Sequence, residues 1–396
     1  MRNFEYHNQT KLIFGKGGEQ KAGTEMARCA KRVLLHHSGG HPARSGLIDT
    51  IKKSLEDAGV EWVELTGVQP NPRLSLVYKG IELAKKEKVE ALLAVGGGSA
   101  IDSAKAIALG AVDGGDVWDF YDGSRVPAGA LPVAAVVTIP AAGSESSVSS
   151  VITNEKGPWK KGANYECTRP VFSILNPEFT YTLPPYQTAC GVADMLAHVM
   201  ERYFTTEQDH QLTDQLCEGT MRTIIHNARA VFEGGRQNYN ACAELMLSGA
   251  IAHNNLLSMG RIGDWASHGI EHELSARYDI AHGAGLAIVF PAWIAYNIKE
   301  EVANGVQPVR FARFAAEVWG VDGACYDCAQ AALEGVFRMR SFFQSIGLPL
   351  TFVDAKLPAD HIEEIASQVT RNGLIGNYTK LDKCAVEYIL NSVKQS

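Results

Sequence analysis

Residues 89–108 of this chain read VEALLAVGGGSAIDSAKAIA. The segment begins with an almost entirely apolar run, which is typical of a central strand that is buried on both faces of a parallel sheet. Three glycines and Ser99 follow, and the chain then continues in a helical pattern. A strand, a glycine turn and a helix in this order predict one β–α unit of an α/β fold.

The sequence on both sides of this segment repeats the alternation of short β-rich runs and amphipathic stretches. Leu47, Ile51 and Leu55 recur every four positions, which predicts a helix from about residue 46 until Gly59 ends it. A second helix is expected from about residue 73 to residue 88. Strands are expected at residues 32–37, 60–65, 89–95, 133–139 and 171–175. The alternation predicts an N-terminal Rossmann-like α/β domain with a mainly parallel sheet.

The sequence changes character after residues 181–185, which read YTLPP. Beyond this point almost no β-branched alternation remains, and segments with the period of a helix follow one another. We therefore expect two domains. Residues 1–182 are predicted to form a dinucleotide-binding α/β domain. Residues 183–396 are predicted to form an all-helical, metal-binding and substrate domain of about eight to ten helices.

Composition argues against several classes of partner. The 37 Lys and Arg residues face 44 Asp and Glu residues, so the net charge is -7 and no basic block is present to attract a nucleic acid. The longest apolar runs are shorter than the roughly 20 residues of a membrane helix, so no membrane association is expected. Eight scattered cysteines give no disulfide framework, which indicates a cytoplasmic protein.

The glycine turn at residues 96–99 predicts a site for a phosphate. Glycine lets the backbone approach an anion closely, and the start of the helix supplies N–H groups and a partial positive charge. The alternative is a tight turn without a ligand. The turn is not a G-x-G-x-x-G fingerprint, because Ile101 stands where the last glycine belongs, and it is not a P-loop. Asp102 is either a plain helix-start carboxylate or a residue near the nicotinamide ribose or the substrate.

Asp194 and five histidines occur in apolar, Ala-rich contexts in the second half of the chain: His198, His253, His268, His272 and His282. Asp194 and His198 are four residues apart, so both emerge from one face of a helix. His268 and His272 repeat this spacing, and His282 opens a further segment after an expected break at residues 279–281. Since buried polar groups need partners, three histidines and one carboxylate could converge on a metal ion.

Several interpretations of these histidines compete. A lone histidine is more often a satisfied core or surface residue than a ligand, and a bound metal could be purely structural. The H-E-x-x-H protease motif fails, because Ala276 stands where its second histidine belongs. Nitrogen and oxygen ligands without a thiolate suit Fe(II), Zn(II), Ni(II) or Mn(II). A Lewis acid beside a cofactor-binding sheet indicates a dehydrogenase.

Six longer motifs resemble the iron-dependent, group III alcohol dehydrogenase family, and particularly its butanol dehydrogenase and NADPH-dependent aldehyde reductase branch. They are FEYHNQTKLIFGKG (4–17), QPNPRLS (69–75), AVGGGSAIDSAKAIA (94–108), TIPAAGSES (138–146), NPEFTYTLPPYQTACGVADMLAHVMERYF (176–204) and SHGIEHELSARYDIAHGAGLAIVFPAW (267–293). The motifs span almost the whole chain. The resemblance implies hydride transfer between NAD(P)(H) and a primary alcohol or aldehyde, with butanol as the model substrate.

The resemblance also implies roles for single residues. It assigns ligation of one divalent metal, Fe(II) with Zn(II) or Ni(II) as alternatives, to Asp194, His198, His268 and His282. His272 is placed in the substrate pocket, where it takes part in proton transfer together with the cofactor ribose. Asp102 is placed at the nicotinamide end of the cofactor and is expected, with His272, to be a catalytic residue.

The nucleotide is expected to contact residues from several segments: Gly39, Gly40, His41, Gly96, Gly97, Gly98, Ser99, Asp102, Thr138, Ser144 and Lys160. Relatives that prefer NAD tend to carry an acidic residue after the first strand of the nucleotide fold. Here residues 38–41 read SGGH, and Arg44 follows. Without a carboxylate to repel a 2′-phosphate, NADP(H) is expected to be preferred over NAD(H). His41 and Pro42 depart from the family's pattern at this contact.

By resemblance we expect a homodimer that acts on a small-molecule alcohol or aldehyde. Two other activities share the two-domain layout and a metal site, namely a lyase of the dehydroquinate-synthase type and a glycerol or glycerol-phosphate dehydrogenase. A non-enzymatic protein with a closed metal site is a further alternative. Steady consumption of NADPH with a simple aldehyde would separate a reductase from a lyase that only recycles its cofactor.

Overall fold

The computed structural model describes residues 1–40, 45–157 and 159–395. These residues divide into two compact units. The α/β unit comprises His7–Leu183 and Arg236–Asn254, and the helical unit comprises Met1–Tyr6, Pro184–Gly235 and Asn255–Ser396. The predicted boundary near residue 182 separates domains that fold independently. This boundary stays a prediction.

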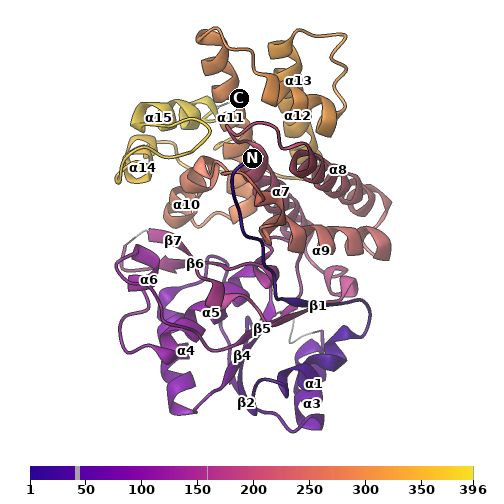
Figure 1. Ribbon diagram of the computed structural model, residues 1–396, viewed down its shortest axis with the longest axis vertical. Coiled ribbons are helices and arrows are strands. Elements are labelled where there is room, and N and C mark those ends of the chain that lie inside the picture. Colours follow the sequence, from indigo (N-terminus) through magenta and orange to yellow (C-terminus); the bar gives the residue numbers. More distant parts are fainter. Residues whose placement is uncertain (41–44, 158, 396) are drawn as a thin grey trace. The chain divides into compact units, whose positions relative to one another are not determined.

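A six-stranded sheet forms the centre of the α/β unit (Figure 1). In spatial order its strands are β1 (Lys11–Phe14), β8 (Phe172–Leu175), β5 (Val133–Val137), β4 (Ala91–Gly96), β2 (Arg32–His37) and β3 (Glu61–Leu65). Every neighbouring pair is parallel, which confirms the predicted fold class. The prediction missed the edge strand β1 and an antiparallel hairpin of β6 (Ser149–Asn154) and β7 (Trp159–Asn164).

Helices α1 (Ala22–Met26) and α3 (Leu47–Asp57) pack on one face of this sheet. The predicted period places Ile51 and Leu55 on the buried side of α3, where they join the side chains that the strands direct to this face. The chain leaves α3 through Gly59, whose φ of 68° lies in the left-handed region that glycine tolerates. The predicted helix is therefore confirmed, together with its stop.

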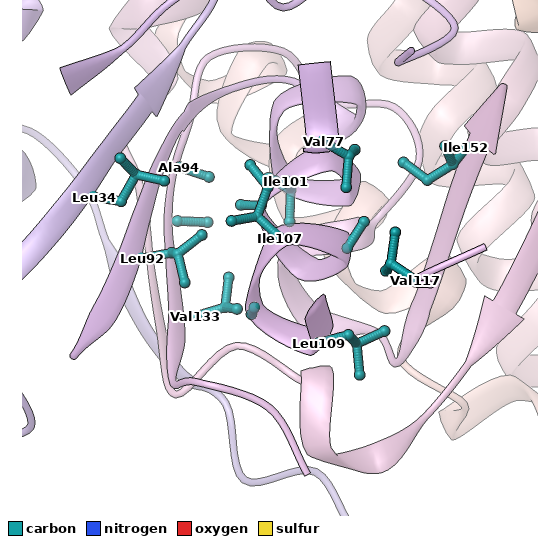
Figure 2. Close-up of a cluster of buried hydrophobic side chains, with 14 of the residues drawn as sticks. Leu34, Val77, Leu92, Ala94, Ile101, Ile107, Leu109, Val117, Val133 and Ile152 are labelled. Carbon is teal, nitrogen blue, oxygen red and sulfur yellow. The ribbon is translucent and has the colours of Figure 1, made fainter. Parts of the chain in front are cut away.

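Helices α4 (Leu74–Lys86) and α5 (Gly98–Val112) cover the opposite face. Figure 2 shows the core beneath them, in which Leu92 of β4 lies near Ile101 and Ile107 of α5. Helix α5 is buried along most of its length, because alanine and glycine let it lie close to its neighbours. This close packing fixes the start of α5 relative to the end of β4.

The strand order reverses between β2 and β4, which are neighbours in the sheet although β3 separates them along the chain. After β2 the chain forms β3 on one side, and after β4 it forms β5 on the other. In open α/β sheets a ligand crevice lies at the carboxyl ends of the strands at such a point. Residues 38–40 after β2 and the glycine turn after β4 therefore mark the expected nucleotide site.

The part of the chain after residue 184 is helical. Its helices are α7 (Pro185–Tyr203), α8 (Gln211–Gly234), α9 (Tyr239–His253), α10 (Ala266–Tyr278), α11 (His282–Ala303), α12 (Val309–Trp319), α13 (Cys328–Ser345), α14 (Ile362–Val369) and α15 (Lys383–Ser392). These nine helices, counted over the described residues, agree with the predicted number, and the expected break separates α10 from α11. Helix α9 packs within the α/β unit rather than with the other helices.

An aromatic cluster anchors the helical unit. The ring of Phe204, which follows α7, lies 5.4 Å from the ring of Trp293 on α11 and 5.0 Å from that of Phe311 on α12. All three side chains are fully buried. The cluster holds together α7 and α11, two of the helices that carry predicted metal ligands. Among the described helices, none is long and apolar enough to cross a membrane.

Candidate metal centre and nucleotide-binding turn

Three of the predicted metal ligands gather at one point of the helical unit. Asp194 lies on α7, His268 lies on α10, and His282 is the first residue of α11. A ligand atom of each lies within 4.8 Å of the other two, and Nε2 of His282 is 3.7 Å from Oδ1 of Asp194. Asp194 and His268 are buried. The three side chains can therefore hold a metal ion between α7, α10 and α11.

His198, the fourth predicted ligand, flanks this group. It follows Asp194 by one turn of α7, and its Nδ1 atom lies 3.6 Å from Oδ1 of Asp194. Its ring stacks on the ring of His268, with the centroids 4.9 Å apart. The fold thus brings the four predicted ligands into one neighbourhood, with His198 at the side of the other three.

Two buried glutamates contact the histidines, and the sequence prediction missed both. Glu201, on α7, accepts a hydrogen bond from Nδ1 of His268 at 2.7 Å. Glu271, on α10, contacts Nδ1 of His282. Both glutamates are fully buried. A signal existed, because Glu201 follows His198 by three residues and Glu271 follows His268 by three, so each lies on the ligand-bearing face of its helix.

His272 lies one turn after His268 on α10, beside the ligand group. The centroid of its ring is 6.3 Å from that of His268 and 5.4 Å from that of His282. Its ligand atom forms a second close group with those of Glu271 and His282. Since only His268 joins the group that contains Asp194, the geometry favours His268 over His272 as the ligand.

The donor set fits a divalent cation. Among the residues that the structure describes, no hydrogen-bond partner reaches the buried Nε2 atom of His268. Leaving a buried polar atom unsatisfied costs about 1–3 kcal/mol, and a cation at this point would satisfy it. A carboxylate together with imidazoles suits Fe(II), Zn(II) or Ni(II), as the sequence predicts.

A further buried carboxyl group lies at the start of α10. Asp264 accepts hydrogen bonds from the backbone N–H groups of Ala266, Asn377 and Tyr378. Burial, and after it the nearby charge of Glu201, raise the pKa of Asp264 to about 6. Two carboxyl groups therefore lie near the N-terminus of α10, where the helix dipole favours negative charge.

In the α/β unit, the glycine turn leaves no room for side chains. A Cβ atom on Gly97 would lie 2.3 Å from Cγ2 of Ile139, and one on Gly98 would lie 2.9 Å from Cβ of Ala142. Only glycine therefore lets the segment that carries Ile139 and Ala142 pack this closely against the start of α5. This fits the pyrophosphate cradle that the sequence predicts at residues 96–99.

Asp102 has protein partners in this structure. Its Oδ1 atom accepts a hydrogen bond from the Ser144 hydroxyl, and its Oδ2 atom accepts one from the backbone N–H of Val151 at 3.0 Å. One turn later on α5, Lys105 is fully buried and donates to the carbonyl oxygens of Ser144, Ser147 and Ser149. The sequence prediction missed Lys105, whose signal is a lysine among alanine and isoleucine residues in a largely apolar helix.

Thr138 and Gly39 lie just after β5 and β2, the two strands on either side of β4 in the sheet. Thr138 directly follows β5, and its N–H group donates to the carbonyl oxygen of Gly96 at 3.0 Å. Gly39 follows β2, and its N–H group donates to Nδ1 of His37 at 3.0 Å. Both residues therefore lie at the carboxyl ends of the strands, where the nucleotide is expected.

Other residues that the sequence singled out lie on β7, at the end of α9 or outside the described part of the chain. Lys160 lies on β7, where it is buried and donates to Oδ1 of Asn71 at 3.0 Å. His253 ends α9 in the α/β unit and packs against Gly143, so it does not belong to the ligand group. His41 lies outside the described residues.

Comparison with known proteins identifies the family. The family model described as iron-containing alcohol dehydrogenase matches residues 9–177, and the model of the C-terminal part of the Fe-containing alcohol dehydrogenase family matches residues 188–393. The chain is 40% identical over 396 residues to the probable NADH-dependent butanol dehydrogenase 1 of Bacillus subtilis, and the match covers 100% of both proteins. It is 32% identical to the NADPH-dependent aldehyde reductase YqhD of Escherichia coli, over 94% of each chain.

A solved structure of a similar protein supports the same family. The NADH-dependent butanol dehydrogenase A of Thermotoga maritima superposes with a TM-score of 0.93 at 39% identity, covering 100% of this chain and 99% of the other. The likeness therefore extends over both units. Together with the two family models, it shows that this chain belongs to the iron-containing alcohol dehydrogenase family.

Proposed function

We propose that this chain interconverts aldehydes and primary alcohols of butanol-like size, using a nicotinamide cofactor and one divalent metal ion. The observation that carries the proposal is the group formed by Asp194, His268 and His282 in a member of this family. Relatives named butanol dehydrogenase and aldehyde reductase support this choice of substrate.

The residues of the chain have separate proposed roles in the reaction. Bound NAD(P)H would supply the hydride, and a bound divalent metal would supply a Lewis acid for the substrate oxygen. Asp194 and the imidazoles of His198, His268 and His282 would hold that ion and leave a net positive charge where the oxygen gains negative charge. His272 is the group that we propose to move the proton of the substrate hydroxyl.

The turn at residues 96–99 is proposed to hold the pyrophosphate. Gly97 and Gly98 allow Ile139 and Ala142 to pack closely against the turn, and the start of α5 supplies N–H groups and a positive dipole end for the phosphates. Thr138, Ser144 and Lys160 complete the set of residues proposed to contact the cofactor, together with those that follow β2.

We propose that NADPH is preferred over NADH. Residues 38–40 carry no carboxylate that would repel a 2′-phosphate. The names of the butanol dehydrogenases point to NADH instead, and that of the aldehyde reductase points to NADPH. The ratio of kcat/KM for the two cofactors with butanal decides the question. A ratio in favour of NADH would overturn the preference and leave the proposed reaction intact.

We propose iron(II) as the metal, in keeping with the description of the family model. Zn(II) and Ni(II) are the alternatives that the same donor set allows. Metal analysis of protein purified without added metal, followed by reconstitution with each ion in turn, tests this. The highest kcat/KM should be obtained with Fe(II), and a higher value with Zn(II) or Ni(II) would reassign the metal.

The reaction itself is tested with butanal and the reduced cofactor. We expect cofactor oxidation in proportion to the aldehyde added, and formation of one butanol for each aldehyde consumed. A lyase of the dehydroquinate-synthase type would show no net consumption of the cofactor. Turnover of glycerol together with no turnover of butanol would instead point to a glycerol dehydrogenase.

We also propose that the chain acts as a homodimer in the cytoplasm. The edge strand β1 leaves Leu12 and Phe14 exposed, which is a surface that a second copy could cover. All eight cysteines are free thiols, which suits a reducing compartment. The mass in solution, measured by light scattering, tests the dimer, and a monomeric mass would refute it.

A further inference from the structure

The side chain of Glu201 is surrounded by hydrogen-bond donors. Its Oε1 atom accepts from Nδ1 of His268 at 2.7 Å and from the backbone N–H of the same residue at 3.1 Å. Its Oε2 atom accepts from the backbone N–H of Trp265 at 2.5 Å. Glu201 is 0% exposed, so water does not compete for these positions. All three hydrogen bonds join α7 to the first turn of α10.

These contacts determine which nitrogen of His268 carries the proton. Both oxygens of Glu201 face N–H donors, so they act as hydrogen-bond acceptors toward His268 and Trp265. Nδ1 of His268 is then the protonated nitrogen, and Nε2 keeps its lone pair. Nε2 is the buried atom for which the described residues provide no partner, and it belongs to the group that contains Asp194.

The ring of His268 is also held from the sides. The ring of His198 stacks on it at 4.9 Å with an interplanar angle of 17°, and the ring of Trp265 lies 5.2 Å away. The guanidinium group of Arg202 lies over Trp265, 4.8 Å from its centroid. The imidazole therefore has little freedom to turn, and Glu201 is the group that sets its tautomer.

We propose that Glu201 is a positioning residue for the metal ligand His268, a role that rests on the proposed function. Through the Nδ1–H tautomer it presents Nε2 to the metal, and its negative charge makes the imidazole a stronger donor. Because it also binds two N–H groups at the start of α10, it fixes the backbone that carries His268 relative to Asp194 on α7.

The structure explains why an amide cannot replace this carboxylate. With three N–H groups around it, the NH₂ group of a glutamine at position 201 would oppose a donor in either orientation. If the amide oxygen faced His268, the NH₂ group would face the N–H of Trp265. If the amide turned round, its NH₂ group would face Nδ1 of His268. This would favour the tautomer of His268 with Nε2 protonated, which offers no lone pair to a metal.

The test is the affinity of the full-length chain for Zn(II), measured by competition with a chromophoric chelator. We expect Glu201→Gln to weaken Zn(II) binding by about 10- to 100-fold, which is typical of losing such a partner. The absorption spectrum of the Co(II)-loaded variant should also differ from that of the wild type. Wild-type affinity and an unchanged Co(II) spectrum in Glu201→Gln would overturn the proposal.

Glu218→Gln is the matched control. Glu218 is buried in the same unit and accepts hydrogen bonds from the Tyr203 hydroxyl at 2.9 Å and from Nε of Arg313 at 2.7 Å. It belongs to neither group of candidate ligands. The control therefore loses a buried carboxylate charge but should keep wild-type affinity for Zn(II). An equal loss in both variants would show that general destabilisation explains the effect, and this would also overturn the proposal.

A second measurement needs no change at position 201. In the full chain before metal is added, ¹⁵N spectra of labelled histidine report the tautomer of His268, assigned by the signal that His268→Gln removes. We expect the proton on Nδ1, and a proton on Nε2 would contradict the proposal. A failure of the proposed function can be distinguished from a failure of this inference. If the proposed function is wrong, the wild-type chain itself binds no Zn(II) or oxidises no cofactor with butanal.

Discussion

The hydroxyl group of Ser144 donates a hydrogen bond of 2.5 Å to Oδ1 of Asp102, although 42 residues separate them along the chain. Together with the backbone N–H of Val151 on Oδ2, this contact joins the first turns of α5 to β6 and to the segment that precedes it. Both elements border the glycine turn. Asp102 therefore holds in place the backbone that is proposed to surround the nucleotide.

Replacing Asp102 by alanine should make the backbone around the glycine turn less rigid. The N–H of Val151 would lose its acceptor, so we expect the free energy of unfolding to fall by about 1–3 kcal/mol. The KM for the nucleotide should rise more than kcat falls, as steady-state kinetics can show. Asp49→Ala, which removes an exposed carboxylate from the first turn of α3, is the control. A large loss of kcat at unchanged stability would instead place Asp102 in the chemistry.

Gly97→Ala should weaken cofactor binding. The added Cβ atom would meet Cγ2 of Ile139 at 2.3 Å, and overpacking of this kind costs typically about 1–3 kcal/mol. The turn or Ile139 must shift to relieve this clash, and a shifted turn would bind the pyrophosphate less well, so we expect the dissociation constant of the nucleotide to rise roughly tenfold, which is about 1.4 kcal/mol. Fluorescence titration measures this constant. Gly114→Ala adds its Cβ atom where nothing lies within 4 Å, and should bind the cofactor like the wild type.

His272→Ala should separate metal binding from proton transfer. His272 lies beside the ligand group, with its ring 5.4 Å from that of His282, but it is not among the proposed ligands. We expect the variant to retain its metal and to lose about 10²- to 10⁴-fold in kcat, the usual range for a general acid or base. Metal analysis and turnover with butanal are measured on the same sample. Loss of the metal would show that His272 is a ligand.

Buried His36 should make stability depend on pH. Burial lowers the pKa of His36 from 6.5 to about 4, and its Nδ1 atom bonds the carbonyl oxygen of Leu65. Between pH 4 and pH 6.5 the unfolded chain binds more protons than the folded chain. The contribution of His36 to stability is therefore complete above pH 6.5 and falls as the pH drops towards 4. The loss is at most roughly 3 kcal/mol.

The difference in unfolding free energy between wild type and His36→Gln, measured from pH 4 to pH 7.5, isolates this effect. We expect the difference to shrink as the pH falls, because only the wild type loses the contribution of His36. A difference that does not change with pH would mean that His36 titrates alike in the folded and unfolded chains.

Much of the α/β unit follows from periodicity in the sequence. The continuous apolar run of β4 and the four-residue period of Leu47, Ile51 and Leu55 each report burial directly, so these elements were predicted. Strand β1 was missed because it is an edge strand, whose exposed side chains break the pattern. The hairpin of β6 and β7 was missed for a similar reason, because its burial does not alternate regularly.

The candidate metal ligands were predictable as residue types, but their mutual arrangement was not. The spacing of four residues placed Asp194 and His198 on one face of α7 and paired His268 with His272. It did not show which histidine of the second pair would meet Asp194, because that depends on how α10 packs against α7. Glu201 was missed for the same reason, since its contact with His268 joins residues that lie 67 positions apart.

The most direct test of the central claim combines metal content and turnover in Asp194→Ala, with His226→Ala on the exposed side of α8 as the control. The carboxylate of Asp194 is the charged member of the proposed set, so its loss should remove the ion and butanal reduction together. The control should keep both. An Asp194→Ala chain that reduces butanal at the wild-type rate without bound metal would contradict the account.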